Sequence, residues 1–162
     1  MKRILFTLLF LILTCQLNAQ SSNNADVNVK ANIIQSISVQ KLADIDFGDI
    51  PQNTGKHTIP SDGTDAGKIE ISSAANKSIN ISIPQTITLQ NSNSDNLTFT
   101  SEVPIYNGSD DQGGATQLTD NSGGAVTPQT NTTYVWLGGY VNSDNVNTGL
   151  YEGILTVTVS YN

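Results

Sequence analysis

The stretch that decides the fold is residues 153–161, GILTVTVSY, at the end of the 162-residue chain. Its apolar side chains recur at every second position and alternate with threonine and serine: Leu155, Val157, Val159 and Tyr161. Successive side chains of a β-strand point to opposite faces of a sheet, so this pattern predicts a half-buried strand. We expect these four side chains to form the core face of a terminal strand.

Similar short segments recur upstream, with turn-forming residues between them. Residues 67–83, GKIEISSAANKSINISI, carry alternating isoleucines on both sides of a polar connection, which predicts a β-hairpin. Residues 86–89 and 96–103 predict two more strands around the turn NSNSDN, because Asn, Asp and Ser side chains favour turns. Residues 133–141, TYVWLGGYV, predict a strand buried on both faces, with Trp136 in the core.

The N-terminal part carries a further alternating segment. Residues 25–31, ADVNVKA, predict a strand, and a β-branched run follows over residues 33–39. One face of this segment carries four apolar side chains: Val27, Val29, Ala31 and Ile33. A terminal strand either pairs within its own sheet or adds to the sheet edge of a neighbouring copy, where this face would serve strand exchange. The pattern leaves both alternatives open.

The chain as a whole favours one all-β domain over residues 20–162. No extended stretch shows the 3.6-residue period of a helix. Instead, about seven to nine short strands with turns between them predict an immunoglobulin-like antiparallel β-sandwich. A closed barrel is less favoured because the strands and loops are uneven in length. Residues 107–131, rich in Gly, Ser, Asp and Asn, predict a long loop with one short strand near residues 116–118.

Residues 1–19 have the features of a signal peptide. Lys2 and Arg3 precede an apolar run, and Ala19 supplies the small residue at the cleavage site. The run has about ten residues, whereas a membrane-spanning helix needs about 20. Cys15 allows the alternative of a lipoprotein, although Thr14 occupies a position that usually holds a smaller residue. We expect an exported protein that lies in the periplasm, outside the cell or on the cell surface, without a transmembrane segment in its mature chain.

The composition argues against several classes of function. Lys2 and Arg3 lie in the leader, so five lysines and no arginine would face 14 acidic residues in the mature chain. This acidic balance disfavours nucleic acid as a partner. Cys15 is the only cysteine and His57 the only histidine, which leaves few groups for nucleophilic or acid–base catalysis. We therefore expect no enzyme, no catalytic residues, no cofactor and no metal site.

Three alternatives remain open on the residues. Exposed aromatic side chains would stack on sugars in a carbohydrate-binding module, and the candidates are Tyr106, Trp136 and Tyr140. A hydrolase would need a facing pair of carboxylates, for which Asp44, Asp46 and Asp49, or Asp110 and Asp111, are available. The oxygen-rich loops 61–67 and 108–114 have ligands that calcium prefers, but neither has the spacing of an established calcium loop.

Four segments carry a family resemblance: residues 25–34 (ADVNVKANII), 42–51 (LADIDFGDIP), 67–84 (GKIEISSAANKSINISIP) and 134–162 (YVWLGGYVNSDNVNTGLYEGILTVTVSYN). In this order they resemble a family of exported bacterial proteins, the domain of unknown function family 4402. The most specific parts are Phe47-Gly48 and the pattern of Gly149, Tyr151 and Gly153 before the terminal strand. The resemblance covers essentially the whole mature chain and implies no catalytic residues.

The ending is also similar to the last strand of spore-coat-U-type and fimbrial subunits. Those proteins fold as immunoglobulin-like sandwiches, so the resemblance implies a pilus or surface-structure role. The chain lacks the cysteine pair that many fimbrial subunits carry. We therefore expect a structural or adhesive surface protein that contacts other copies of itself or other envelope proteins, with a carbohydrate-binding module as the alternative.

Overall fold

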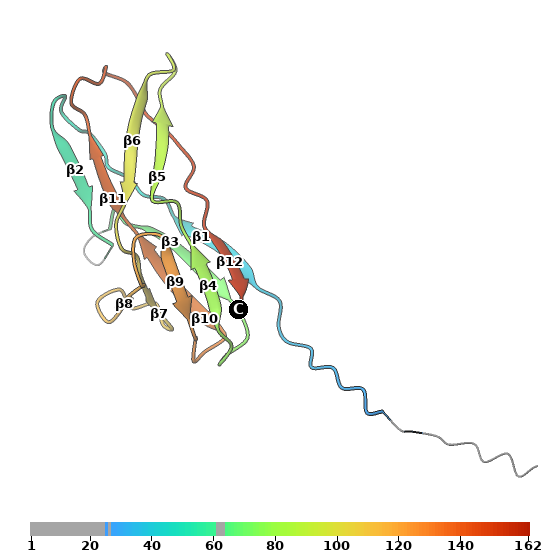
Figure 1. The fold of residues 1–162 in the computed structure, drawn as a ribbon. Helices are drawn as coiled ribbons and strands as arrows, with labels where there is room; N and C mark the ends of the chain where they lie inside the picture. Colours follow the sequence, from blue (N-terminus) through green and yellow to red (C-terminus); the bar gives the residue numbers. More distant parts are fainter. Residues whose placement is uncertain (1–24, 26, 61–63) are drawn as a thin grey trace, which may run out of the picture. The chain divides into compact units, whose positions relative to one another are not determined.

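The computed structural model describes residues 25, 27–60 and 64–162. Residues up to Ile33 form one unit and Ile34–Asn162 form the other, which holds every described strand. These residues contain no helix, and their twelve strands form three antiparallel sheets (Figure 1). The prediction of an all-β antiparallel sandwich is confirmed, with more strands than expected. The signal peptide predicted over residues 1–19 lies outside the described residues.

Each sheet has a simple order of strands. The first is β1 (Ser38–Ala43), β3 (Gly67–Ser72), β10 (Thr132–Leu137), β7 (Ile105–Asn107) and β8 (Thr116–Gln117). The second is β2 (Gly55–Thr58), β11 (Gly139–Asn142), β6 (Asn96–Ser101) and β5 (Thr86–Gln90). The third is β12 (Thr158–Tyr161), β4 (Ile79–Ser82) and β9 (Gly123–Val126).

The main core lies between the first and the third sheet. Ile71 of β3, Ile79 and Ile81 of β4 and Val135 of β10 are each at most 1% exposed and belong to one cluster. Burial of such side chains stabilises the fold by about 1.5–3 kcal/mol each. The alternating isoleucines of β3 and β4 therefore face each other from opposite sheets.

The predicted hairpin over residues 67–83 is wrong in its pairing. β3 pairs with β1 and β10, whereas β4 pairs with β12 and β9. The connection between them crosses from one sheet to the other, and Ser73 within it is fully buried. Alternation fixes which side chains face the core, but two strands of a hairpin and two strands in facing sheets show the same alternation.

The segment 132–142 changes sheet in its middle. β10 belongs to the first sheet and β11 to the second, with Gly138 between them. A Cβ atom at Gly138 would lie 2.1 Å from the Thr58 carbonyl oxygen, and one at Gly139 would lie 2.3 Å from that of Thr100. Only glycine allows the backbones to approach so closely. Trp136 is 4% exposed, which confirms its predicted place in the interior.

Other boundaries differ from the sequence expectation. No strand occurs in the described residues before Ser38, so the strand predicted over residues 25–31 is not found. The strands predicted around NSNSDN are β5 and β6, which pair as a hairpin. β8 confirms the short strand near residues 116–118, whereas β2 and β9 were not predicted. In the part of the chain that the structure describes, no helix could cross a membrane.

Candidate functional site

The terminal strand is covered less completely than its neighbour. Val159 pairs with Ile81 and Tyr161 with Ile79, so these side chains face the same core. Ile79 and Ile81 are at most 1% exposed, whereas Val159 and Tyr161 are only partly buried. Leu155 and Val157 continue the same partly buried row and also pack against the core.

The backbone of the terminal segment is also incompletely paired. The strand predicted over residues 153–161 forms a ladder only from Thr158 onward. Before it, Glu152 exchanges two backbone hydrogen bonds with Gln90, of 2.9 and 3.0 Å. Among the described residues, no backbone hydrogen bond involves residues 153–157. The alternation of exposed and partly buried side chains nevertheless continues through them.

β1 is a second incompletely covered edge. Val39 pairs with Ile71, so both side chains face the core, yet Val39 is 44% exposed and Ile71 is fully buried. Within the described residues, β1 pairs only with β3 and β12 only with β4. The outer edge of each strand is therefore open.

The two open edges lie on the same side of the sandwich (Figure 1). The Tyr161 hydroxyl donates a hydrogen bond of 2.6 Å to the Gln35 carbonyl, just before β1, and accepts one of 2.7 Å from the Ala74 amide. Ile37, also just before β1, packs against the same core cluster as Val159. We call the strip between β1 and residues 153–161 the open seam; it is lined by Ile37, Val39, Leu155, Val157 and Val159.

The predicted strand-exchange face is exposed. Val27, Val29 and Ile33 are 82%, 92% and 95% exposed, and Ala31 is exposed as well. Their segment has no strand partner among the described residues. Four exposed apolar side chains at alternate positions of an unpaired segment are unfavourable in water, and pairing of the segment as a strand with a sheet edge would bury them on one face.

A polar network holds the start of the terminal segment. Asn91 donates hydrogen bonds to Asp95 (2.9 Å) and to the Tyr151 hydroxyl (3.2 Å), and Asn147 donates one to Asp95 (3.1 Å). The hydrogen bonds from Asn91 and Asn147 lower the pKa of Asp95. Burial and, secondarily, the charge of Asp95 raise the pKa of Tyr151. The network ties the loop before Glu152 to the tip of the β5–β6 hairpin.

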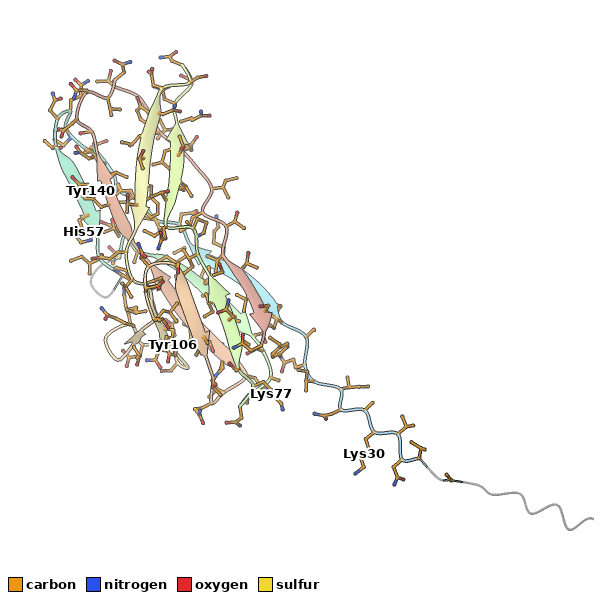
Figure 2. All side chains as sticks on the ribbon, in the orientation of Figure 1. Lys30, His57, Lys77, Tyr106 and Tyr140 are labelled. Atoms are coloured by element: carbon orange, nitrogen blue, oxygen red, sulfur yellow. The ribbon has the colours of Figure 1, made fainter. Side chains whose placement is uncertain are left out.

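The structure separates the three aromatic candidates for sugar stacking. Trp136 is buried beneath Lys68, whose ammonium lies 5.5 Å from its ring centroid. Tyr106 is partly buried against the core. Tyr140, on the outer face of β11 beside His57 of β2, is 43% exposed (Figure 2). A Cβ atom at Gly55 would lie 2.7 Å from two ring carbons of Tyr140, so the ring covers Gly55.

The charged candidates serve local contacts. His57 Nε2 lies 2.5 Å from Glu102 Oε2, and both side chains are substantially exposed. Asp44 pairs with Lys41, and Asp46 accepts a hydrogen bond from the Gly48 amide. The described residues contain no group of three His, Cys, Asp or Glu side chains arranged to hold a metal ion. Loop 61–67, a calcium candidate, lies partly outside the described residues.

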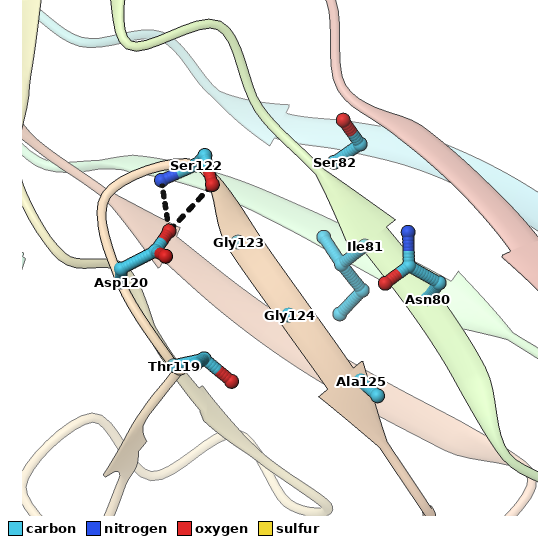
Figure 3. Close-up of a pocket in the computed structure, with 9 residues that line it drawn as sticks. All are labelled: Asn80, Ile81, Ser82, Thr119, Asp120, Ser122, Gly123, Gly124 and Ala125. Atoms are coloured by element: carbon cyan, nitrogen blue, oxygen red, sulfur yellow. Dashed lines mark hydrogen bonds between the residues drawn. The ribbon is translucent and has the colours of Figure 1, made fainter.

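A polar hollow of about 350 Å³ lies on the outer face of β4 and β9 (Figure 3). Asp120 at its rim accepts hydrogen bonds from the backbone amide and the hydroxyl of Ser122, which lower its pKa. Asn80, Ser82 and the glycines of β9 line the rest. None of the aromatic candidates and none of the seam residues contributes to this hollow.

Comparison with known proteins agrees with the family that the sequence resembles, over a range that leaves out residues 25–34, the first of the four segments. No curated protein matches the chain. The model of one family, described as a domain of unknown function (DUF4402), matches residues 37–161. The match covers β1 to β12, including the open seam, and ends at Tyr161. The chain therefore belongs to the domain of unknown function family DUF4402.

Proposed function

We propose that the protein is an exported structural subunit of a bacterial surface whose copies associate by strand addition. In this proposal, residues 27–33 of one copy add as a strand to a sheet edge of the next. The observation that carries it is the exposure of Val27, Val29 and Ile33, at 82–95%, at alternate positions of an unpaired segment. Such a segment gains ladder hydrogen bonds and apolar burial, at about 25 cal/mol per Å², when it joins a sheet.

The sequence before β1 favours a neighbour over the same chain as acceptor. Residues 34–37, Ile-Gln-Ser-Ile, contain Ser36 but no glycine, proline, asparagine or aspartate. Tight turns favour these residue types most strongly and serine more weakly, and β-branched isoleucine disfavours turn conformations. A segment that is disfavoured from turning back sharply onto its own sheet remains available to a second molecule.

Export is a proposal that rests on residues 1–19. The basic start, the short apolar run and Ala19 support cleavage before Gln20. Cleavage there would place the strand-exchange segment within about 15 residues of the mature N-terminus, where chain ends are seldom tied down. An accessible strand near the N-terminus of an exported protein is suited to assembly outside the cytoplasm.

Deletion of residues 21–31 tests the proposal. The truncated protein should remain folded, because all twelve described strands lie within Ile34–Asn162. It should also lose the ability to form multimers. Size-exclusion chromatography with light scattering measures the mass, and far-UV circular dichroism measures the β content. A truncated protein that unfolds, or that assembles like the full mature chain, would contradict strand donation.

A matched pair of substitutions tests the same point in the full mature chain. Val29→Asp places a charge on the apolar face of the segment, and Asn28→Asp places the same charge on the polar face. Only Val29→Asp should prevent assembly, because its carboxylate would have to enter the neighbour's core face without a partner. Equal assembly of the two variants would argue against a buried strand.

Carbohydrate binding remains a second candidate because of Tyr140. Its exposed ring lies in a cross-strand row between His57 and Thr100, and Thr86 extends the row. Hydroxyl groups beside an aromatic ring suit a neutral sugar. Electrophoresis in gels containing soluble neutral polysaccharides would reveal binding as retardation. Tyr140→Ala should abolish it and Tyr140→Phe should retain it; an unretarded native protein would dismiss this candidate.

A further inference from the structure

We infer that the open seam between β1 and residues 153–161 is the acceptor, and that its occupant is residues 27–33 of a second copy of this chain. This inference rests on the proposed function and adds where the donated strand binds. It requires an acceptor with free backbone groups, a row of incompletely buried apolar side chains and a length that matches the donor. The seam meets all three requirements.

Free backbone groups are concentrated along the terminal segment. Among the described residues, residues 153–157 have no backbone hydrogen bond, and β12 is paired only on its β4 side. Unpaired strand edges of this kind attract further strands unless a charge, a proline or a bulge blocks them. Residues 153–161 contain neither a proline nor a charged residue. This side of the seam therefore carries none of the usual protection, whereas β1 on the other side carries Lys41 and a register shift between Lys41 and Ala43.

The apolar side chains on both sides of the open seam, on β1 and on residues 153–161, are incompletely buried. Val39 on β1 is 44% exposed although its partner Ile71 is fully buried. On the terminal segment, Val157 and Val159 are partly buried, although Ile81, which pairs with Val159, is 1% exposed. A strand that binds between β1 and the terminal segment would cover these side chains and complete the core along its open side.

Donor and acceptor match in period and in length. The donor carries apolar side chains at positions 27, 29, 31 and 33, and the terminal segment carries them at 155, 157, 159 and 161. Each row spans seven residues, or about 20 Å of extended strand at 3.3 Å per residue. The donor therefore covers the whole acceptor row in one register and places its apolar face toward the core.

The other sheet edges are less suitable acceptors for a donated strand. β8 has only two residues, Thr116 and Gln117, and both are exposed. β2 carries Lys56 and His57 along its edge. β9 begins with Gly123 and Gly124, and its apolar Val126 is already 4% exposed. β5 is also an edge strand and has partly buried Ile87 and Leu89, but Glu152 already bridges to it at Gln90. Within the described residues, the seam presents a longer apolar row that a further strand would cover.

Disulfide trapping between two single-cysteine variants tests the inference. Cys15 lies in the expected leader, so the mature chain has no other thiol. Lys30 and Thr158 are the central residues of donor and acceptor, and both are exposed. Central positions remain opposite each other whether the strands run parallel or antiparallel. Cross-strand Cα atoms lie about 4.5–5.5 Å apart, within the range that a disulfide accepts.

The experiment mixes mature Lys30→Cys with mature Thr158→Cys, and in parallel with Thr116→Cys on the competing edge of β8. Asn28→Cys and Asn32→Cys, each mixed with Thr158→Cys, cover a shift of register by two residues. Size-exclusion chromatography under reducing conditions first establishes that each variant forms multimers. After mild oxidation, non-reducing electrophoresis and mass spectrometry of peptides quantify the mixed disulfide.

We expect the mixed disulfide with Thr158→Cys to be the main product and that with Thr116→Cys to stay at the background of random collision. Equal yields, or a higher yield with Thr116→Cys, would overturn the seam as acceptor. If the trapping yields overturn the seam but multimers disappear on deletion of residues 21–31, only the acceptor is wrong, and association by strand addition still stands. If deletion leaves the multimers unchanged, the proposed function fails regardless of the trapping result.

Discussion

β4 and the terminal strand carry the same sequence pattern but occupy different environments. Both alternate β-branched or other apolar residues with small polar ones. β4 has a strand on each side, and Ile79 and Ile81 are at most 1% exposed. The terminal strand β12 pairs with β4 on one side only, and the apolar side chains of residues 155–161 are partly buried. The difference locates the part of the core that one copy of the chain leaves open.

The largest expected effect contrasts the two strands directly. Ile81→Ala should lower the free energy of unfolding by about 2–5 kcal/mol, because it leaves a cavity in a closed core. Val159→Ala, at the paired position on β12, should cost about 1 kcal/mol in the monomer, because its side chain is already in partial contact with water. Urea denaturation of the protein lacking residues 21–31 measures both. Equal losses would mean that the seam is closed in the monomer.

A smaller effect distinguishes the two faces of the terminal segment. Val157→Asp should lower the stability of the monomer by about 1–3 kcal/mol, because a carboxylate would replace a side chain that contacts the core. Thr158→Asp faces solvent and should change it by less than about 0.5 kcal/mol. Melting temperatures followed by circular dichroism compare the two variants. Equal shifts would show that the assignment of the core face is wrong.

The smallest effect concerns the network at the start of the terminal segment. Hydrogen bonds from Asn91 and Asn147 lower the pKa of Asp95 in the folded protein. The stabilisation is therefore complete above the unfolded pKa, about 3.9 for aspartate, and is lost as the pH falls through the folded value. Asp95→Asn should weaken the dependence of stability on pH below about 4.

Asp49→Asn serves as the control for that measurement, because no described hydrogen bond involves its side chain. Chemical denaturation of both variants between pH 2 and pH 6, a range of about two units on each side of the aspartate pKa, gives the comparison. If the free energy of unfolding falls at low pH in Asp95→Asn as it does in the native protein, this network does not contribute to holding the loop before Glu152.

The sequence predicted the fold class and the faces of the strands better than their partners. Alternation at 69–71 and 79–83 identified core isoleucines, which are 0–6% exposed. It assigned them to one hairpin, although they belong to facing sheets, because pairing depends on contacts distant in sequence. β2 and β9 are short and β9 begins with two glycines, so neither has the periodicity that reveals a strand.

The candidate site was only partly predictable for a related reason. The apolar faces of residues 27–33 and 155–161 are visible as alternation in the sequence. The open edges of β1 and β12 are not, because alternation shows which side chains would be buried and not how many neighbours a strand has. The exposure of Tyr140 likewise depends on its position over Gly55, which no local pattern around either residue indicates.

The central claim is that the seam of one copy binds residues 27–33 of another. Amide hydrogen exchange of the protein lacking residues 21–31, with and without a synthetic peptide of residues 24–34, tests this most directly. The account predicts fast exchange of residues 153–157 in the free protein and protection of these amides, and of β1, when the peptide is added. A peptide with Val27, Val29 and Ile33 replaced by serine should give no protection. Unchanged exchange at residues 153–157, or protection confined to another edge, would contradict the claim.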